Sequence, residues 1–349
     1  MIEFIKIFVS LVPVFVLLAL LILLDSYKLV SLRSAIKAIG AGCLVAIVGL
    51  YLNTWLTQIL TLSVSGFSAY IAPLTEESLK ALYIVYLLRR TRIGFLVDAA
   101  IYGFAIGAGF AFVENIYYLS ALTNSNILLW VVRGFGTAVM HGSTAAILGM
   151  ISKYLSDRYP ACGFVSLLPG MGAAIIVHAV YNNFLISPLY STVILLTFLP
   201  LLVIFVFERS EKATQRWLGI GLDADMELLD LIISGNISQT RIGVYLESLK
   251  SRFRGEVVAD MLCLLRLQLE LSLQVKGIIL MREVGIPVSP EPQLVEKFAE
   301  LKYLEKSIGK TGKLAILPFF RSSSKDLWQR FMLNKWAGES RERRSAPPR

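Results

Sequence analysis

The sequence predicts an all-α protein: a polytopic membrane helix bundle of about seven spans, followed by a helical domain in the aqueous phase. Hydrophobic residues make up 56% of the 349 residues and charged residues only 17%, and the mean hydropathy is +0.66. A typical soluble domain has about 45–50% apolar and about 25% charged residues. The composition therefore excludes a disordered chain and argues against an ordinary soluble domain.

The charged residues are spread unevenly, and this sets the predicted domain boundary. Residues 1–207 contain 11 Lys and Arg and 7 Asp and Glu, whereas residues 208–349 contain 23 and 18. We predict a membrane-embedded domain at 1–207, a helical cytoplasmic domain at 208–338 and a disordered basic tail at 339–349. In so apolar a chain, the net charge of +9 indicates basic loops at a membrane rather than a nucleic-acid partner.

Seven stretches meet the length requirement for a membrane helix, which is about 20 predominantly apolar residues. They lie at about residues 5–24, 36–60, 68–88, 95–120, 127–152, 162–186 and 188–207. No small-residue cleavage site follows the first stretch, so we expect an uncleaved first span rather than a removed signal peptide.

The basic residues between these stretches predict the orientation. They follow the first, third, fifth and seventh stretches: Lys28, Arg33, Lys37, Arg89, Arg90, Arg92, Lys153, Arg158, Arg209 and Lys212. The intervening loops near 61–67, 121–126 and 187 contain no Lys or Arg. By the positive-inside rule, the N-terminus lies outside and the C-terminus in the cytoplasm. We therefore predict a multi-pass protein of the cell membrane, in contact with the lipid bilayer.

Apolar residues at helical spacing predict helices at 223–233, 238–253, 256–284 and 293–305 in the second domain. The domain contains no nucleotide-binding glycine pattern and no zinc-finger spacing. We expect it to self-associate, to bind a regulator or to control the membrane domain.

Ionisable side chains inside the spans cost about 2.5–3.5 kcal/mol each on insertion scales, so each needs a reason. Spans three to six contain Glu76, Glu77, Lys80, Asp98, Glu114, Arg133, His141 and His178. The helical rise places most of them in one layer, in the outer half of the membrane. We expect Asp98 to be interfacial and Arg133 to extend outward to the interface.

Local spacings relate this layer to chemistry. Glu76 and Lys80 are four residues apart, so they share a helix face and can pair. His178 and Asn182 also share a face and offer the N–H donors that an oxyanion site needs. A carboxylate base and such hydrogen-bond donors are the groups that the hydrolysis of an amide bond requires.

Spans three to six each contain one short motif. These motifs are EExxK at Glu76–Lys80, FxxxEN at Phe110–Asn115, the block Met140–Ser143, and HxxxN at His178–Asn182. Together they resemble the PrsW family of intramembrane proteases. That family belongs with the CAAX prenyl endopeptidases and the bacteriocin-processing enzymes. The resemblance covers roughly residues 65–186, in their order and spacing.

The resemblance implies that residues 1–207 are a protease-like domain. It implies the catalytic set Glu76, Glu77, Glu114, His141, His178 and Asn182, with Lys80 and Asn115 in support. Glu76 is expected to activate water as the general base, and His178 and Asn182 to stabilise the oxyanion. The family cleaves membrane-anchored anti-sigma factors on the outer side, so the resemblance implies a membrane-protein substrate near the outer face.

Three alternatives stay open. A zinc-dependent protease would draw its ligands from Glu76, Glu77, Glu114, His141 and His178. Because no HExxH is present, we prefer a glutamate mechanism without a cofactor. Buried carboxylates and histidines also occur in ion-coupled transporters and proton relays, although no inverted repeat is evident here. The third alternative is a receptor or scaffold that functions through its cytoplasmic helices.

Overall fold

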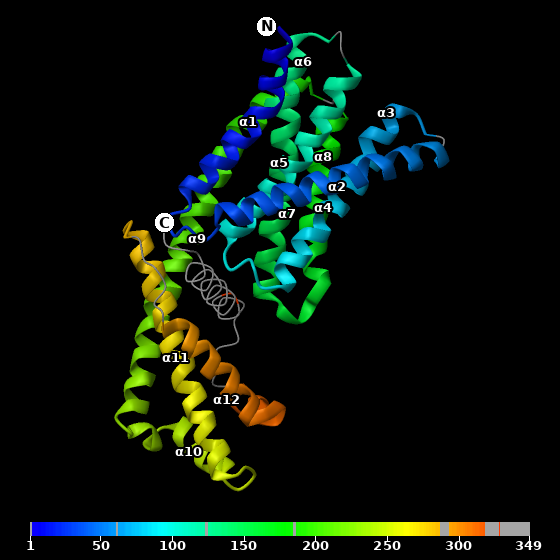
Figure 1. Ribbon diagram of the computed structural model, residues 1–349. Coiled ribbons are helices and arrows are strands. Elements are labelled where there is room, and N and C mark those ends of the chain that lie inside the picture. The colour runs from blue at the N-terminus through cyan, green and yellow to red at the C-terminus, as the bar shows by residue number, and fades with distance from the viewer. Residues whose placement is uncertain are drawn as a thin grey trace, which may run out of the picture. The chain divides into compact units, whose positions relative to one another are not determined.

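The computed structural model describes residues 2–60, 62–122, 125–183, 186–286, 293–317 and 328. Every secondary-structure element in these ranges is a helix, as predicted (Figure 1). The chain divides into two compact units, Met1–Glu211 and Lys212–Arg349. The tail predicted at 339–349 lies outside the described residues.

Unit 1 contains eight α-helices, three short π or 3-10 segments and the first part of a long helix, counted within the described residues. They are α1 (Ile2–Leu24), α2 (Leu32–Ile59), α3 (Val64–Gly66), η1 (Phe67–Ile71), α4 (Ala72–Arg89), α5 (Leu96–Ala121), α6 (Ile127–Val131), η2 (Val132–Thr137), α7 (Ala138–Arg158), η3 (Pro160–Leu167), α8 (Leu168–Asn182) and the start of α9 (Pro188–Ile233).

Six helical segments are long and apolar enough to cross a membrane, among the residues that the structure describes. They are Glu3–Leu24, Leu32–Ile59, Leu96–Ala121, Ile127–Arg158, Gly163–Asn182 and Pro188–Ile233. The expected third span corresponds to α4, which carries Glu76, Glu77 and Lys80 and is too charged to count with these six. The protein is thus a multi-pass membrane protein, while its seven-span count and its orientation stay predictions.

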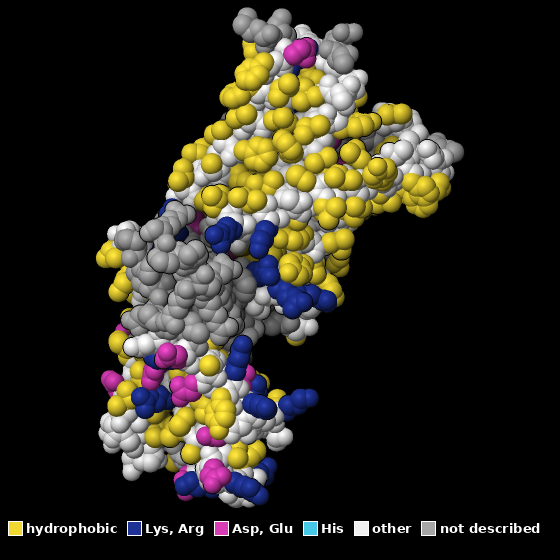
Figure 2. Space-filling model, in the orientation of Figure 1, with side chains coloured by type: hydrophobic (Ala, Val, Ile, Leu, Met, Phe, Trp, Pro, Cys, Tyr) yellow, Lys and Arg dark blue, Asp and Glu magenta, His cyan; other side chains and the backbone are white. Residues whose placement is uncertain are grey.

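The surface of unit 1 is unusually apolar. Hydrophobic side chains cover the face of unit 1 seen in Figure 2, and large ones are exposed on several helices, including Leu23 (69%), Leu44 (63%), Leu82 (65%) and Phe198 (67%). Water would make such a surface costly, whereas lipid chains solvate it. The exposed side chains therefore agree with a membrane environment.

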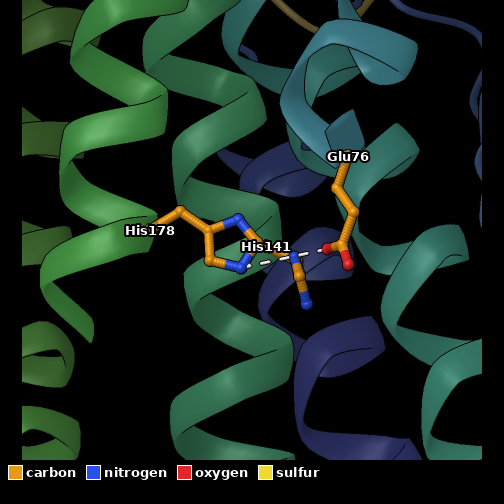
Figure 3. Close-up of side chains that lie close together, drawn as sticks. All are labelled: Glu76, His141 and His178. Carbon is orange, nitrogen blue, oxygen red and sulfur yellow. Dashed lines mark ion pairs between the residues drawn. The ribbon is translucent and has the colours of Figure 1, made fainter. Parts of the chain in front are cut away.

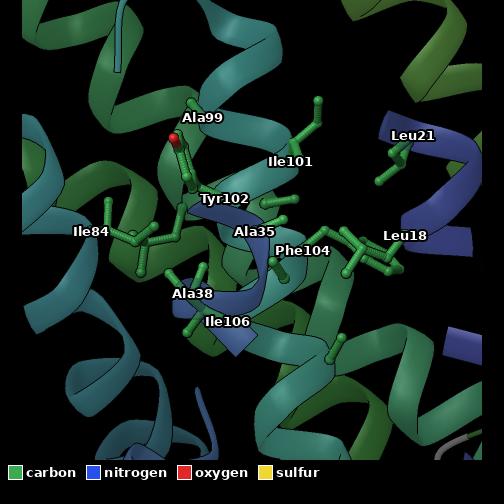
Figure 4. Close-up of a cluster of buried hydrophobic side chains, with 14 of the residues drawn as sticks. Leu18, Leu21, Ala35, Ala38, Ile84, Ala99, Ile101, Tyr102, Phe104 and Ile106 are labelled. Carbon is green, nitrogen blue, oxygen red and sulfur yellow. The ribbon is translucent and has the colours of Figure 1, made fainter. Parts of the chain in front are cut away.

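Helix α5 lies at the centre of unit 1, because 83% of its most apolar 18-residue stretch is buried. It packs mainly against α7 and α2, around core side chains that include Ile101, Phe104 and Ile106 (Figure 4). Two glycines permit this close packing: a Cβ on Gly107 would lie 2.1 Å from a backbone oxygen of α7, and one on Gly109 would lie 2.1 Å from a backbone oxygen of α2. Small residues at such contacts let helix backbones approach closely.

Replacing Gly107 with Ala is expected to lower the stability of unit 1 by about 1–3 kcal/mol, because the added methyl overlaps the α7 backbone. Thermal unfolding of the purified protein in detergent measures this loss. The matched control is Gly40→Ala on α2, since nothing lies within 4 Å of a Cβ at Gly40. Equal melting temperatures for the two variants would contradict the close α5–α7 contact.

Two π-helical segments, η1 and η2, lie just before α4 and α7. Such wide turns are rare and occur frequently at functional sites, because they rotate the helix that follows. Here they precede the two helices that carry Glu76 and His141.

Unit 2 is built from the end of α9 with η4 (Asn236–Gln239), α10 (Arg241–Leu249), α11 (Gly255–Glu283) and α12 (Gln293–Ile316). The separate helix predicted at 223–233 is instead the last part of α9, which runs from Pro188 to Ile233. Inside unit 2, Lys276 Nζ donates to Asp225 Oδ2 at 2.6 Å. Whether residues 208–338 form the cytoplasmic domain stays a prediction.

Candidate active site

Four helices of unit 1 bring the predicted residues to one internal site. Helix α4 supplies Glu76, Glu77 and Lys80, α5 supplies Glu114 and Asn115, α7 supplies His141, and α8 supplies His178 and Asn182. The π-helical turns and the close glycine contacts set the rotation and spacing of these helices. Site residues that are up to about 100 positions apart in the sequence, such as Glu77 and His178, therefore lie close together in space.

Glu77 is the most enclosed acid of the site, with a side chain 0% exposed. Its Oε1 accepts hydrogen bonds from Lys80 Nζ at 2.7 Å and from Thr144 Oγ1 at 3.1 Å, and lies 2.8 Å from His178 Nδ1. Because a carboxylate only accepts, the His178 proton belongs on Nδ1. The other ring nitrogen of His178, Nε2, then carries a lone pair.

Lys80 pairs with Glu77 and not with Glu76, although its spacing allowed a pair with either glutamate. The physical reason is that Glu76 turns towards a cavity, whereas Lys80 is fully buried. The Lys80 ammonium also lies 2.9 Å from His141 Nδ1 and 4.4 Å from the centre of the Phe110 ring. A single cation thus neutralises Glu77 and touches the first histidine.

Glu76 lies beside both histidines, as Figure 3 shows. Its Oε1 accepts a hydrogen bond from Asn53 Nδ2 at 3.1 Å, and its Oε2 is 3.9 Å from His178 Nε2. The residue is buried against protein, yet it lines the wall of a cavity.

Glu114 lies 3.1 Å from His141 Nε2 and 3.3 Å from Arg133 Nη2. Arg133 also donates from Nε to Asn115 at 2.9 Å and stacks over the Tyr118 ring at 3.8 Å. The expectation that Arg133 extends outward to the interface is therefore wrong, because the partly buried Glu114 on the neighbouring α5 provides its counter-charge. Arg133 and His141 hold the Glu114 carboxylate from two sides.

Three polar residues lie away from the Glu76–histidine centre. Asn115 donates to the Ser10 carbonyl at 2.7 Å, which ties α5 to α1. Asn182 lines the cavity and donates to the Ser68 carbonyl at 3.0 Å. Asp98, predicted to be interfacial, is 1% exposed within the protein, and its Oδ2 accepts from two backbone N–H groups at the start of α5.

The cavity at this site has a volume of about 300 Å³. Helices α2, α4, α5, α7 and α8 contribute to its wall, which includes Asn53, Glu76, Glu114, His141, His178 and Asn182. Aromatic rings on α5 complete the wall, among them Phe110 and Tyr118. The cavity is large enough for water together with part of a peptide chain.

Three side chains of the site could hold a divalent metal. One ligand atom each from Glu76, His141 and His178 can be chosen so that all three lie within 4.8 Å of one another. Two imidazoles with one carboxylate is a zinc ligand set found in peptidases. The Glu77 carboxylate behind His178 Nδ1 is the outer contact that orients histidine ligands in metal sites.

A multi-pass helix bundle with glutamates and histidines around an internal cavity has the features of an intramembrane protease. The model of the PrsW family intramembrane metalloproteases matches residues 31–207, which is half of the chain. The chain belongs to the PrsW family. No curated protein and no solved structure matches it.

The match confirms the resemblance seen in the four motifs, and with it a membrane-embedded peptidase. All eight predicted site residues lie within the matched range. The family description and the Glu76, His141 and His178 group support the zinc alternative more than the preference for a mechanism without a cofactor. The catalytic role of each residue stays a prediction.

Two side chains that contact the site, Thr144 and Asn53, were not predicted from the sequence. Thr144 donates to Glu77, and its position three residues after His141 places it on the same face of α7. Asn53 donates to Glu76 from α2. The signal for Asn53 was an amide in an otherwise apolar stretch, where an unpaired polar group would be costly.

Proposed function

We propose that the protein is an endopeptidase that hydrolyses a peptide bond of a membrane-anchored protein within the cavity of unit 1. The observation that carries the proposal is the convergence of Glu76, His141 and His178 at the wall of that cavity. Membership of a peptidase family supports the reaction class over an ion-coupled transporter, a proton relay or a scaffold.

Glu76, His141 and His178 would hold a zinc ion, which supplies a Lewis acid that polarises the scissile carbonyl and activates water. Glu77 orients His178 through Nδ1 and keeps the lone pair on Nε2. Glu114 faces the cavity beside His141 and is placed to take up the proton of the attacking water. Asn182 keeps a second amide N–H besides the one bonded to Ser68, and this can bind the oxyanion.

A mechanism without metal remains the second candidate because of one contact. Lysine has donors only, so its 2.9 Å contact makes His141 Nδ1 an acceptor and puts the ring proton on Nε2, next to Glu114. A neutral imidazole in that form offers no lone pair to a metal at Nε2. In this mechanism Glu76 activates water directly, and His178 and Asn182 stabilise the oxyanion.

Metal analysis separates the two mechanisms. We expect the purified protein to retain stoichiometric zinc and to lose zinc and cleavage of a single-span reporter together when treated with 1,10-phenanthroline, because the ligands would hold the activating ion. Added zinc should restore cleavage, and the non-chelating 1,7-phenanthroline serves as the control. Full cleavage by metal-free protein would overturn the zinc mechanism in favour of the glutamate mechanism.

The substrate and the side of cleavage follow from the charge pattern and the family resemblance. We propose a single-span protein of the anti-sigma-factor kind, cut near the outer face of the cell membrane. Basic loops that flank alternate spans support an N-terminus outside and a C-terminus in the cytoplasm. Residues 208–338 would then form a cytoplasmic domain that self-associates or binds a regulator, with no nucleic-acid partner.

A further inference from the structure

Asn53 reaches the active site from α2, a helix that carries none of the residues in the four motifs. Its side-chain Nδ2 donates to Glu76 Oε1 at 3.1 Å, across the contact between α2 and α4. It also lines the cavity, where it is only partly buried. Asn53 therefore touches a carboxylate that faces both the cavity and His178.

The orientation of the Asn53 amide follows from its two partners. A carboxylate only accepts hydrogen bonds, so the amide must turn its NH₂ towards Glu76. The amide oxygen, Oδ1, then faces Thr75 Oγ1, which donates to it at 2.6 Å and also lies 3.0 Å from the Ala72 carbonyl oxygen. A flipped amide would place Oδ1 against the Glu76 carboxylate, which only accepts, so the carboxylate opposes the flip and the Thr75 hydrogen bond stabilises the observed orientation.

These two hydrogen bonds, from Thr75 to Asn53 and from Asn53 to Glu76, leave the two carboxylate oxygens of Glu76 with different surroundings. Oε1 is occupied by Asn53, while Oε2 lies 3.9 Å from His178 Nε2. A hydrogen bond to one oxygen fixes the plane of a carboxylate and aims the other oxygen. Reacting groups must be held to within a fraction of an ångström for efficient catalysis.

We infer that Asn53, itself oriented by Thr75, is a positioning residue that aims Glu76 Oε2 at the reaction centre. The inference rests on the proposed peptidase function of the same cavity. It assigns a role in catalysis to α2, outside the four motifs.

Neighbouring hydroxyls on α2 show that this contact is specific. Thr54 and Thr57 also line the cavity, but each donates to a carbonyl of its own helix, at Leu50 and Asn53 respectively. In the described part of α2, Asn53 is the residue with a hydrogen bond to a predicted catalytic side chain. Non-specific packing of α2 against α4 would not require the Asn53 amide to donate a hydrogen bond to Glu76.

The test uses the full-length protein reconstituted with a single-span reporter, and measures kcat and KM separately. Asn53→Leu keeps the size of the side chain and removes the donor. Loss of a supporting contact of this kind typically costs about 10–100-fold, so we expect kcat to fall by that factor with KM little changed. The same variant should bind zinc about tenfold more weakly, as measured by competition with a chelating dye.

The pair with Thr75 supplies a readout that a merely structural role would not give. Thr75→Val should lower kcat about three- to tenfold, because the Asn53 amide loses the hydrogen bond that holds its orientation. In the double variant Asn53→Leu/Thr75→Val, kcat should equal that of Asn53→Leu alone, since Thr75 acts through Asn53. Asn183→Leu is the matched control, because the Asn183 amide bonds to the Ala179 carbonyl of its own helix.

The outcomes distinguish this inference from the proposed function. Reporter cleavage by Glu76→Gln at the wild-type rate would contradict the peptidase function itself. Cleavage lost in Glu76→Gln but unchanged in Asn53→Leu, with unchanged zinc affinity, would overturn only the role of Asn53. If the kcat losses of Asn53→Leu and Thr75→Val multiply in the double variant, Thr75 does not act through Asn53, and that part of the inference is overturned.

Discussion

Glu76→Gln is expected to abolish reporter cleavage, with a fall in rate of about 100-fold to 10,000-fold, the range lost with a catalytic acid or base. Glutamine has nearly the same shape and can still accept the hydrogen bond from Asn53, but it offers no carboxylate to a metal or to water. Because Glu76 lines a cavity and does not neutralise Lys80, the fold should survive. Cleavage of a single-span reporter in proteoliposomes measures the effect.

Two comparisons make this result interpretable. Glu3→Gln removes a carboxylate from α1 whose side chain is 71% exposed, and it should cleave like the wild type. Unchanged melting temperatures for both variants would show that the fold is intact. Wild-type cleavage by Glu76→Gln would end the protease interpretation, and ion flux through the reconstituted protein without cleavage would support the transporter or relay.

Lys80→Met is expected to destabilise unit 1 by about 3–5 kcal/mol, because it leaves the Glu77 carboxylate buried without its cation. Both side chains of this pair are 0% exposed, and their 2.7 Å contact is the shortest that the described ion pairs make with Glu77. Activity should be lost as well, since Lys80 also holds His141. Unfolding of the purified protein in detergent measures the loss of stability.

A second substitution tests the cause of this loss. Removing both charges, in Lys80→Met/Glu77→Gln, should restore most of the stability, because the penalty arises from an unpaired buried charge. Lys37→Met replaces an exposed lysine on α2 and should change stability by less than about 0.5 kcal/mol. If the double variant is as unstable as Lys80→Met, unpaired charge is not the cause.

Much of the site could be predicted because the membrane restricts ionisable residues to places where they have a use. Glu76, Glu77, Glu114, His141 and His178 were selected on that ground, and the structure brings all five together. The helix class was predictable for the same reason, since a chain in lipid must satisfy its backbone hydrogen bonds internally.

The partners of these residues could not be predicted, because they depend on helix rotation. Spacing alone allowed Lys80 to pair with Glu76 at four residues or with Glu77 at three, and the structure selects Glu77. Arg133 was free, on sequence grounds, to extend outward, but Glu114 from another helix holds it inside. Hydropathy likewise could not show that α9 continues past the apolar segment to Ile233.

The sequence by itself determined the all-helical class, the apolar membrane domain and the short list of ionisable residues, because local composition and periodicity decide these properties. Only the tertiary structure decided that Asn53 reaches Glu76, that Glu77 supports His178, and that Glu76, His141 and His178 share one cavity. Those contacts depend on how glycine-mediated packing and π-helical turns rotate each helix against its neighbours. That rotation is a property of the assembled bundle rather than of any single segment.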